Sequence, residues 1–282
     1  MHKIISITVI SIITIIFTVI IFLTTIGFKT NNFNVLINEK INKINPKIKL
    51  KLNQLNFKLN PTNFKFEIFT LDPKIAVNEK KVDLETINFD LNVFDYLNNR
   101  NPISGISIIS KDNNISQLTD FINEYDFNLA RSLIFNQIKR GKIKIISKIT
   151  FDEKNPKKIK YIINGSVSDA EIKLLNQSKI ENINFDFLVD QDVVNLNGIE
   201  LSFDKIFVTS EKISIKKINK STEISGNFKT KKTKINLKNY KKIININLDL
   251  IDDRPIDLSS DNNISFKINK KFKIEDLSII SK

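Results

Sequence analysis

The ten residues IENINFDFLV, from Ile180 to Val189, decide the fold class of this chain. Within them Ile183, Phe185, Phe187 and Val189 stand at every second position. Successive side chains of a strand point to opposite faces of a sheet, so this alternation predicts a strand with one apolar and one wet face. The same alternation recurs along most of the chain, at Ile48/Leu50/Leu52, Phe64/Phe66/Ile68, Ile87/Phe89/Leu91/Val93, Ile143/Ile145, Ile159/Tyr161/Ile163, Ile199/Leu201/Phe203, Ile206/Val208, Ile213/Ile215, Ile244/Ile246/Leu248/Leu250 and Ile264/Phe266/Ile268.

The breaks between these segments are short and rich in Asn, Asp, Lys and Gly, which favours antiparallel hairpins. A one-residue slip after Leu52 then puts Leu55, Phe57 and Leu59 in step, which suggests a bulge or bend. The sequence therefore predicts a mainly β chain with an elongated, curved antiparallel sheet. The apolar sides of so many strands must be shielded from water, and the sequence allows two arrangements of the sheet. The sheet closes on itself as a barrel or sandwich, or it leaves a long apolar groove.

Two segments show helical spacing instead. Phe33, Leu36, Ile37, Ile41 and Ile44 form one stripe, and Pro46 predicts that this helix ends before it. A second helical region is expected from Ser116 to Arg140, as a pair of helices. Ser116 and Asp126 are the expected N-caps, and Gly141 after Lys139 and Arg140 is the expected C-terminal stop.

The first segment of the chain has the character of a membrane anchor. No charged residue lies between Lys3 and Lys29. A helix over Ile4–Phe28 is long enough for a hydrocarbon core of about 30 Å. A buried soluble helix of this length and apolarity is unusual, and a cleaved signal peptide would have a shorter apolar run and a small-residue exit. We therefore predict an uncleaved single-pass anchor over residues 1–29, with a short head that is typical of export of everything after it.

The amino-acid composition excludes several kinds of functional site. The 282 residues include no Cys and a single His, His2, so disulfides, thiolate metal sites and His-based catalysis in the body are excluded. We expect no cofactor, no metal and no catalytic residues. Adjacent carboxylates such as Asp252 and Asp253, or Asp152 and Glu153, point to opposite faces of a strand and are better interpreted as turn residues than as a hydrolase site.

The net charge of +13 is the excess of 44 Lys and Arg residues over 31 Asp and Glu residues, and only Arg100, Arg131, Arg140 and Arg254 are Arg. Nucleic-acid readers usually contain Arg forks with interleaved aromatic residues, whereas here Lys is spread along the whole body. We therefore expect no nucleic-acid partner. A cationic surface of this kind favours anionic partners such as lipid head groups.

The order of these parts resembles the AsmA-like family, which includes the TamB- and YhdP-type envelope proteins. The resemblance rests on the N-terminal span, a short helix, and the segments at residues 48–52 (IKLKL), 64–75 (FKFEIFTLDPKI), 86–97 (TINFDLNVFDYL), 161–175 (YIINGSVSDAEIKLL), 180–187 (IENINFDF) and 224–228 (ISGNF). It implies a bacterial inner-membrane anchor, a periplasmic body and an apolar β-groove. The implied role is phospholipid transport to the outer membrane, or support of outer-membrane assembly. Full-sized relatives are longer, so this resemblance implies the N-terminal part of a longer protein, or a partner.

On this interpretation residues 1–29 are the anchor, 30–140 an AsmA-like β region with a helical insert, and 141–282 a β-meander repeat region. The partners would be phospholipid acyl chains, the bilayer and other envelope proteins. Phe185, Phe187 and Ile246 are the candidates for the groove lining, although the sequence leaves the inward face of each strand open. The alternative is a non-enzymatic envelope scaffold that has a closed β core and acts through protein contacts.

Overall fold

The computed structural model describes residues 2–98, 103–152, 159–174, 178–203, 206–218, 221–236, 254–269 and 273–281. The chain forms two compact units. The first unit comprises residues 1–111 and 146–161, and the second comprises residues 112–145 and 162–282.

The first unit starts with the long helix α1 and continues mostly as strands. Its elements are α1 (His2–Thr25), β1 (Phe28–Thr30), α2 (Asn34–Ile44), β2 (Ile48–Lys51), β3 (Leu55–Asn60), β4 (Lys65–Leu71), β5 (Lys74–Val77), β6 (Lys80–Asn92), α3 (Val93–Leu97) and β7 (Ile103–Ser110).

The second unit begins with a helical hairpin and ends in a series of long strands. Two strands, β9 and β10, contribute residues to both units. The elements are β8 (Asn113–Asn114), α4 (Ile115–Tyr125), α5 (Leu129–Phe135), β9 (Ile138–Phe151), β10 (Ile159–Lys173), β11 (Lys179–Val189), β12 (Val193–Phe203), β13 (Ile206–Ile218), β14 (Ser221–Ile235), β15 (Ile256–Asn269) and β16 (Ile274–Ser281).

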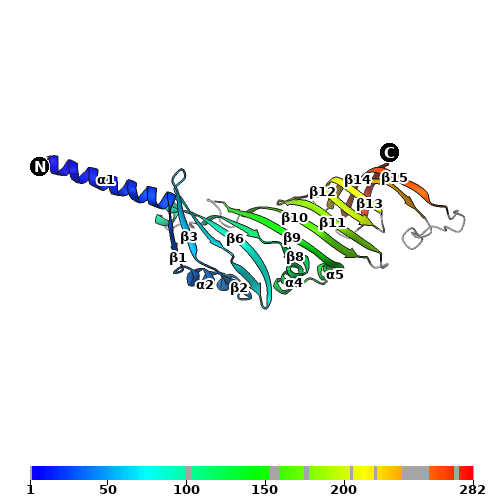
Figure 1. Cartoon of the computed structure of the whole chain (residues 1–282), viewed down its shortest axis with the longest axis horizontal. Helices are drawn as coiled ribbons and strands as arrows, with labels where there is room; N and C mark the ends of the chain where they lie inside the picture. Colours follow the sequence, from blue (N-terminus) through cyan, green and yellow to red (C-terminus); the bar gives the residue numbers. More distant parts are fainter. Residues whose placement is uncertain are drawn as a thin grey trace. The chain divides into compact units, whose positions relative to one another are not determined.

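The strands join in one antiparallel sheet, as the sequence predicts (Figure 1). The main order is β1-β3-β4-β6-β7-β9-β10-β11-β12-β13-β14-β15-β16, while β2 and β5 pair beside β6, and β8 pairs with β9. Because β1 and β16 lie at opposite ends of this order, the sheet is open. A mainly β fold with an apolar N-terminal helix and few short helices is confirmed, and the closed core of the scaffold alternative is not what forms.

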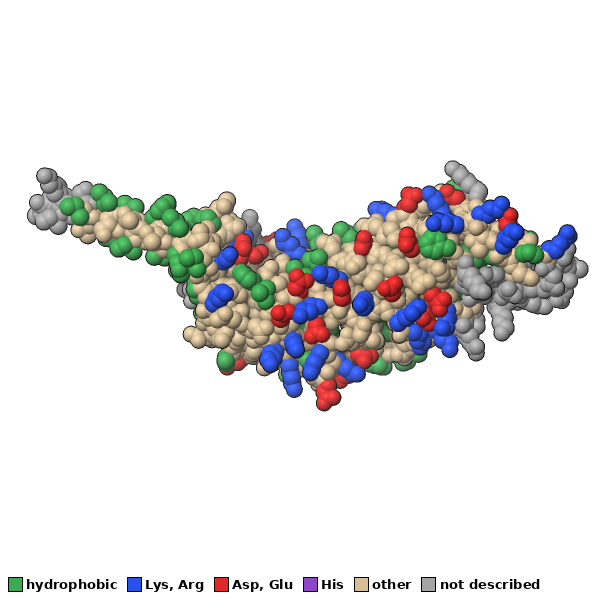
Figure 2. All heavy atoms as spheres, viewed as in Figure 1, with side chains coloured by type: hydrophobic (Ala, Val, Ile, Leu, Met, Phe, Trp, Pro, Cys, Tyr) green, Lys and Arg blue, Asp and Glu red, His purple; other side chains and the backbone are tan. Residues whose placement is uncertain are grey.

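Helix α1 is apolar along its length, and the segment Ile7–Thr25 is long and apolar enough to cross a membrane. Three of its hydroxyls bond within the helix, because Oγ1 of Thr14, Thr18 and Thr25 donates to the carbonyl four residues earlier at 2.7–2.9 Å. Figure 2 shows hydrophobic side chains along α1, whereas charged side chains of both signs are spread over the body.

Gly27 ends α1 and leads directly into β1. Its φ of +69° belongs to the left-handed region, and its backbone N–H donates to the Phe22 carbonyl at 2.9 Å. A Cβ at this position would lie 2.1 Å from the Phe57 carbonyl oxygen on β3. Only glycine therefore permits this close passage from helix to sheet.

The core of the first unit follows the register of β3, β4 and β6. Leu55 pairs with Thr70, and Phe57 pairs with Ile68, so their side chains share one face. Leu55 is completely buried, which contributes about 1.5–3 kcal/mol for a side chain of this size. The Phe57 ring stacks on Phe28 with centroids 4.6 Å apart, and Phe33 just before α2 adds a tilted contact at 5.4 Å.

The structure corrects the expected bulge between Leu52 and Leu55. The two segments are separate strands, because β2 pairs with β5 while β3 pairs with β1 and β4. The change in alternation marks a change of partner. The predicted end of α2 before Pro46 is confirmed, since α2 ends at Ile44.

The helical hairpin also differs in detail from the expectation. Asn114 is the N-cap of α4, and its amide and Gln117 form a reciprocal capping box. Asn128, whose side chain accepts from Arg131 N at 3.0 Å, caps α5. The predicted caps Ser116 and Asp126 were wrong by two residues each, with Asp126 at the C-terminal end of α4.

Gly141 does not end a helix. It lies within β9, which already starts at Ile138. A Cβ at Gly141 would lie 2.7 Å from Ile115 Cδ1 and 2.8 Å from the Cα of Ala170. The glycine serves close packing of α4 and β10 against β9, and this tertiary requirement outweighs the local pattern of cations followed by glycine.

Candidate functional site

The pairing of strands β10 to β16 brings apolar residues into two continuous rows on one face of the sheet. Residues directly opposite each other in an antiparallel pair share a face. The first row is Ile163, Val189, Val194, Ile215, Ile224 and Phe266. The second row is Gly165, Phe187, Leu196, Ile213, Gly226, Ile264 and Ile279. We call this surface the apolar face.

The intervening residues form polar rows on the opposite surface, the polar face. One row is Asn164, Leu188, Asn195, Ser214, Ser225, Ser265 and Ser278, and another is Lys216, Glu223, Lys267 and Glu275. The second of these rows alternates in charge from strand to strand, so Glu223 and Lys267 each lie between two opposite charges. The sheet is therefore two-sided, with an apolar face and a water-compatible face.

Within the described part of the chain, little covers the apolar face along its later strands. The extensive contacts of β12 to β16, among the described residues, are with their neighbours in the sheet. Side chains such as Val194, Ile215 and Ile224 are accordingly half-buried rather than buried, and Ile279 is 57% exposed. An apolar surface left in this state is typical of a binding surface in a water-soluble domain.

The helical hairpin covers the other end of this face. Ile115 at the start of α4 is buried against Val167, Ala170 and Ile183, and partly buried side chains of β9 to β12 pack around this cluster. Phe185 and Phe187, two of the predicted lining residues, belong to this packing. Their rings are 6.4 Å apart and tilted by 57°. The third candidate, Ile246, lies outside the described residues.

Bulges keep the apolar residues on one face where the sequence alternation slips. Three pairs of apolar residues are spaced by three positions instead of two, with a residue of positive φ between them. These are Val167 and Ala170 around Asp169, Ile180 and Ile183 around Asn182, and Leu196 and Ile199 around Gly198. The register shifts of β10, β11 and β12 fall at these places. Each extra residue restores the phase of its strand and bends the sheet locally.

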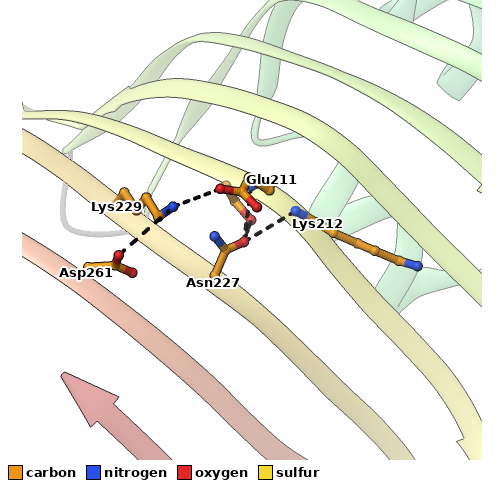
Figure 3. Close-up of polar contacts among 6 residues, drawn as sticks. Glu211, Lys212, Asn227, Lys229 and Asp261 are labelled. Atoms are coloured by element: carbon orange, nitrogen blue, oxygen red, sulfur yellow. Dashed lines mark hydrogen bonds and ion pairs between the residues drawn. The ribbon is translucent and has the colours of Figure 1, made fainter. Parts of the chain in front are cut away.

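Asparagine side chains hold the bulge at Asp169 and a further irregularity in β13. Asn184 Oδ1 accepts from the backbone N–H of Asp169 at 3.0 Å. In the same manner Asn227 Oδ1 accepts from the N–H groups of Glu211 and Lys212 at 3.1 and 3.4 Å, across the irregular part of β13 (Figure 3). The amide oxygen thereby gives these backbone N–H groups an acceptor where the strand register is irregular.

Ion pairs lie on the polar face beside Asn227. Lys229 Nζ lies 2.7 Å from Glu211 and 4.0 Å from Asp261 (Figure 3). The hydrogen bond from Lys229, followed by its charge, lowers the pKa of Glu211, and the same contact raises the pKa of Lys229. Lys267 and Asp276 form a similar pair at 2.7 Å. All of these groups are substantially exposed, so each pair contributes little to stability by itself.

The described residues contain no group of three His, Cys, Asp or Glu that could hold a metal ion. Of the carboxylates considered for hydrolysis, Asp152 follows directly after β9, whereas Glu153, Asp252 and Asp253 lie outside the described residues. The candidate site is therefore a surface. Its chemistry is the contact of Ile, Val, Leu and Phe side chains with an apolar ligand.

Two features of this surface were not predicted from the sequence. One is the role of Asn184 and Asn227 as hydrogen-bond acceptors at the strand irregularities, and the other is the continuity of the two apolar rows. The sequence did carry one signal of this continuity. Gly165 and Gly226 stand at positions that the alternation assigns to the apolar side, and both belong to the second row. Comparison with known proteins finds no matching family model, no matching curated protein and no matching solved structure. The resemblance to the AsmA-like family thus stays a prediction.

Proposed function

We propose that this protein is a membrane-anchored lipid carrier of the AsmA-like type, in which α1 crosses the bacterial inner membrane and the body handles phospholipid in the periplasm. Its acyl chains would lie along the apolar face, on the way to the outer membrane or in support of its assembly. The observation that supports this proposal is the pair of apolar rows, which cross six and seven strands and are backed by polar rows.

The two apolar rows are better suited to moving a lipid along the sheet than to binding it tightly at one place. Contact with Ile, Val and Phe side chains gains about 0.8 kcal/mol per buried CH₂ group, without any directional bond. Neighbouring strands are about 4.8 Å apart, so an acyl chain that moves by one strand meets a similar set of side chains. No position along Val194, Ile215 and Ile224 binds much better than the next, and a ligand is not trapped at one of them.

The proposal is tested by crosslinking at neighbouring residues that face opposite ways. A photoreactive benzoylphenylalanine is placed at Ile215 or Ile224 on the apolar face, and at Lys216 or Ser225 on the polar face, in the full chain in cells. We expect phospholipid adducts, identified by mass spectrometry, at the two Ile positions and few at the two polar-face positions. Equal labelling of both faces, or no lipid at either, would overturn lipid carriage.

A protein scaffold is the second candidate, in an open-sheet form. The observation in its favour is the end strand β16, along which every described residue is exposed, including Ile274 and Leu277. An edge strand of this kind can pair with a strand of another protein. Protein adducts in place of lipid adducts at Ile215 and Ile224 would select this function.

A further inference from the structure

The sheet edge next to α1 carries a second apolar surface. Only Ile26 and Gly27 separate the end of α1 from β1, so the helix and the sheet are connected with little slack. Phe28 pairs with Phe57, which places the end of β3 beside the end of α1. Helix α1 also contacts β3 extensively.

The turn after β3 and the short helix α3 lie at this same edge. β4 starts at Lys65, which pairs with Asn92, the last residue of β6 before α3. Figure 1 shows the β3–β4 turn close to the end of α1. The edge of the first unit that adjoins the helix is thus formed by the turn at residues 61–64 and by α3.

Apolar side chains are exposed at this edge. Phe64 in the turn and Phe94 in α3 contact each other with ring centroids 5.7 Å apart. They are 45% and 56% exposed, Leu97 is 69% exposed, and Ile26 is 68% exposed. We call Phe64, Phe94 and Leu97 the apolar rim. Thirty residues separate its two aromatic members in the sequence, and the tertiary structure brings them together.

Local hydrogen bonds hold the backbone that carries the two exposed aromatic side chains. Asn63 Oδ1 accepts from Lys65 N at 3.2 Å, and Phe64 itself has a φ of +50°, a conformation that aromatic residues rarely adopt. Asn92 Oδ1 accepts from Phe94 N at 3.0 Å, and Asn98 Nδ2 donates to the Phe94 carbonyl at 2.8 Å. Two separate segments are therefore built to hold aromatic rings outward beside a membrane-length helix.

We propose that the apolar rim lies in the interfacial layer of the same bilayer that α1 crosses. Aromatic and Leu side chains on a surface segment are stabilised when they enter the boundary between head groups and acyl chains. The exposed Lys29 and Lys58 at the same edge would meet the head groups. This inference rests on the anchoring part of the proposed function. It adds a second membrane contact, which would fix the orientation of the first unit on the bilayer.

The absence of Cys from the chain permits a direct depth measurement. The full chain is reconstituted in vesicles of phosphatidylethanolamine and phosphatidylglycerol, with a single Cys carrying an NBD fluorophore at residue 97, 71 or 16. Leu71, at the opposite end of β4, is a matched control because it is also an exposed Leu, at 52%. Ile16 lies in the middle of α1 and reports on the anchor.

We expect lipids spin-labelled near the head group to quench the probe in L97C several-fold more strongly than the probe in L71C. Phe64→Asp and Phe94→Asp together should abolish this difference while the I16C probe stays quenched by deeply labelled lipids. Equal quenching in L97C and L71C, with I16C still quenched, would overturn the rim contact and leave the anchor intact. Loss of quenching in I16C would overturn the anchor itself. Protection of the L97C probe from water without any lipid quenching would show a protein contact and equally overturn the rim contact.

Discussion

The ring of Phe187 on β11 lies over Gly165 on β10, its direct partner in the sheet. A Cβ on Gly165 would be 2.3 Å from Phe187 Cζ and 2.4 Å from the Lys144 carbonyl oxygen. The glycine therefore makes room for a large aromatic side chain within the second apolar row. This contact joins the part of the apolar face under the helical hairpin to the part that is open.

Gly165→Ala should destabilise the protein by about 1–3 kcal/mol, because the new methyl group meets both a ring and a backbone oxygen that cannot easily move. Urea denaturation followed by circular dichroism in detergent micelles measures the change. Gly226→Ala is the comparison, since its nearest atom would be 3.0 Å away on the Ile213 side chain. A loss at Gly226 as large as that at Gly165 would contradict this explanation.

Asn227→Ala should lower the free energy of unfolding by about 0.5–1.5 kcal/mol, because the N–H groups of Glu211 and Lys212 lose their acceptor. Asn227→Asp keeps an acceptor oxygen at this place and should lose less. Hydrogen exchange at Glu211 and Lys212 provides a local readout and should accelerate in Asn227→Ala. Unchanged exchange at both amides would show that the bulge is held by other contacts.

The Lys229–Glu211 pair should give a small pH dependence with a defined sign. The pKa of Glu211 is lowered below its ordinary 4.5, so its stabilising contribution is complete above pH 4.5 and is lost as the pH falls through the lowered value. The pKa of Lys229 is raised above 10.5, so its contribution is lost only as the pH rises through that raised value. Glu211→Gln should therefore differ from the wild type at pH 7 and converge with it in strong acid. A difference that persists at pH 2 would contradict the assignment.

Ile224→Asp should reduce lipid crosslinking from a probe at Ile215, its partner in the first apolar row. A carboxylate on this half-exposed surface attracts water and removes apolar contact area from the ligand. Ser225→Asp, one residue away on the polar face, is the matched control and should leave the crosslinking yield unchanged. If both variants reduce the yield equally, the effect comes from the sheet structure or the net charge.

Ile12→Lys and Ile16→Lys together should prevent stable insertion of α1, because each Lys near the middle of a bilayer-spanning helix costs about 2.5–3.5 kcal/mol. Extraction of membranes with alkaline carbonate separates inserted from peripheral protein. The control, Ile12→Leu with Ile16→Leu, should stay in the membrane pellet. A doubly charged chain that resists extraction would contradict a spanning role for α1.

Alternation and length are local properties, and the sequence was sufficient where they decide the structure. Residue spacing within short segments was enough to predict three elements. These are the strand around Phe185 and Phe187, the helix that ends before Pro46, and the apolar N-terminal helix. Predictions from local patterns were wrong where contacts with residues distant in the sequence determine the structure. Lys139, Arg140 and Gly141 have the composition of a helix end, but strand pairing places them in β9.

A mainly β chain, a membrane-length helix near the N-terminus and strands with one apolar side can all be predicted from residue spacing, because a period of two and a long uncharged run are encoded residue by residue. Which apolar sides join depends on pairing between strands that are distant in the chain. The bulges at Asp169, Asn182 and Gly198 reset the phase of their strands, and pairing between two of these strands aligns Val189 with Val194. The meeting of Phe64 with Phe94 likewise depends on the pairing of β4 with β6, which neither segment encodes alone.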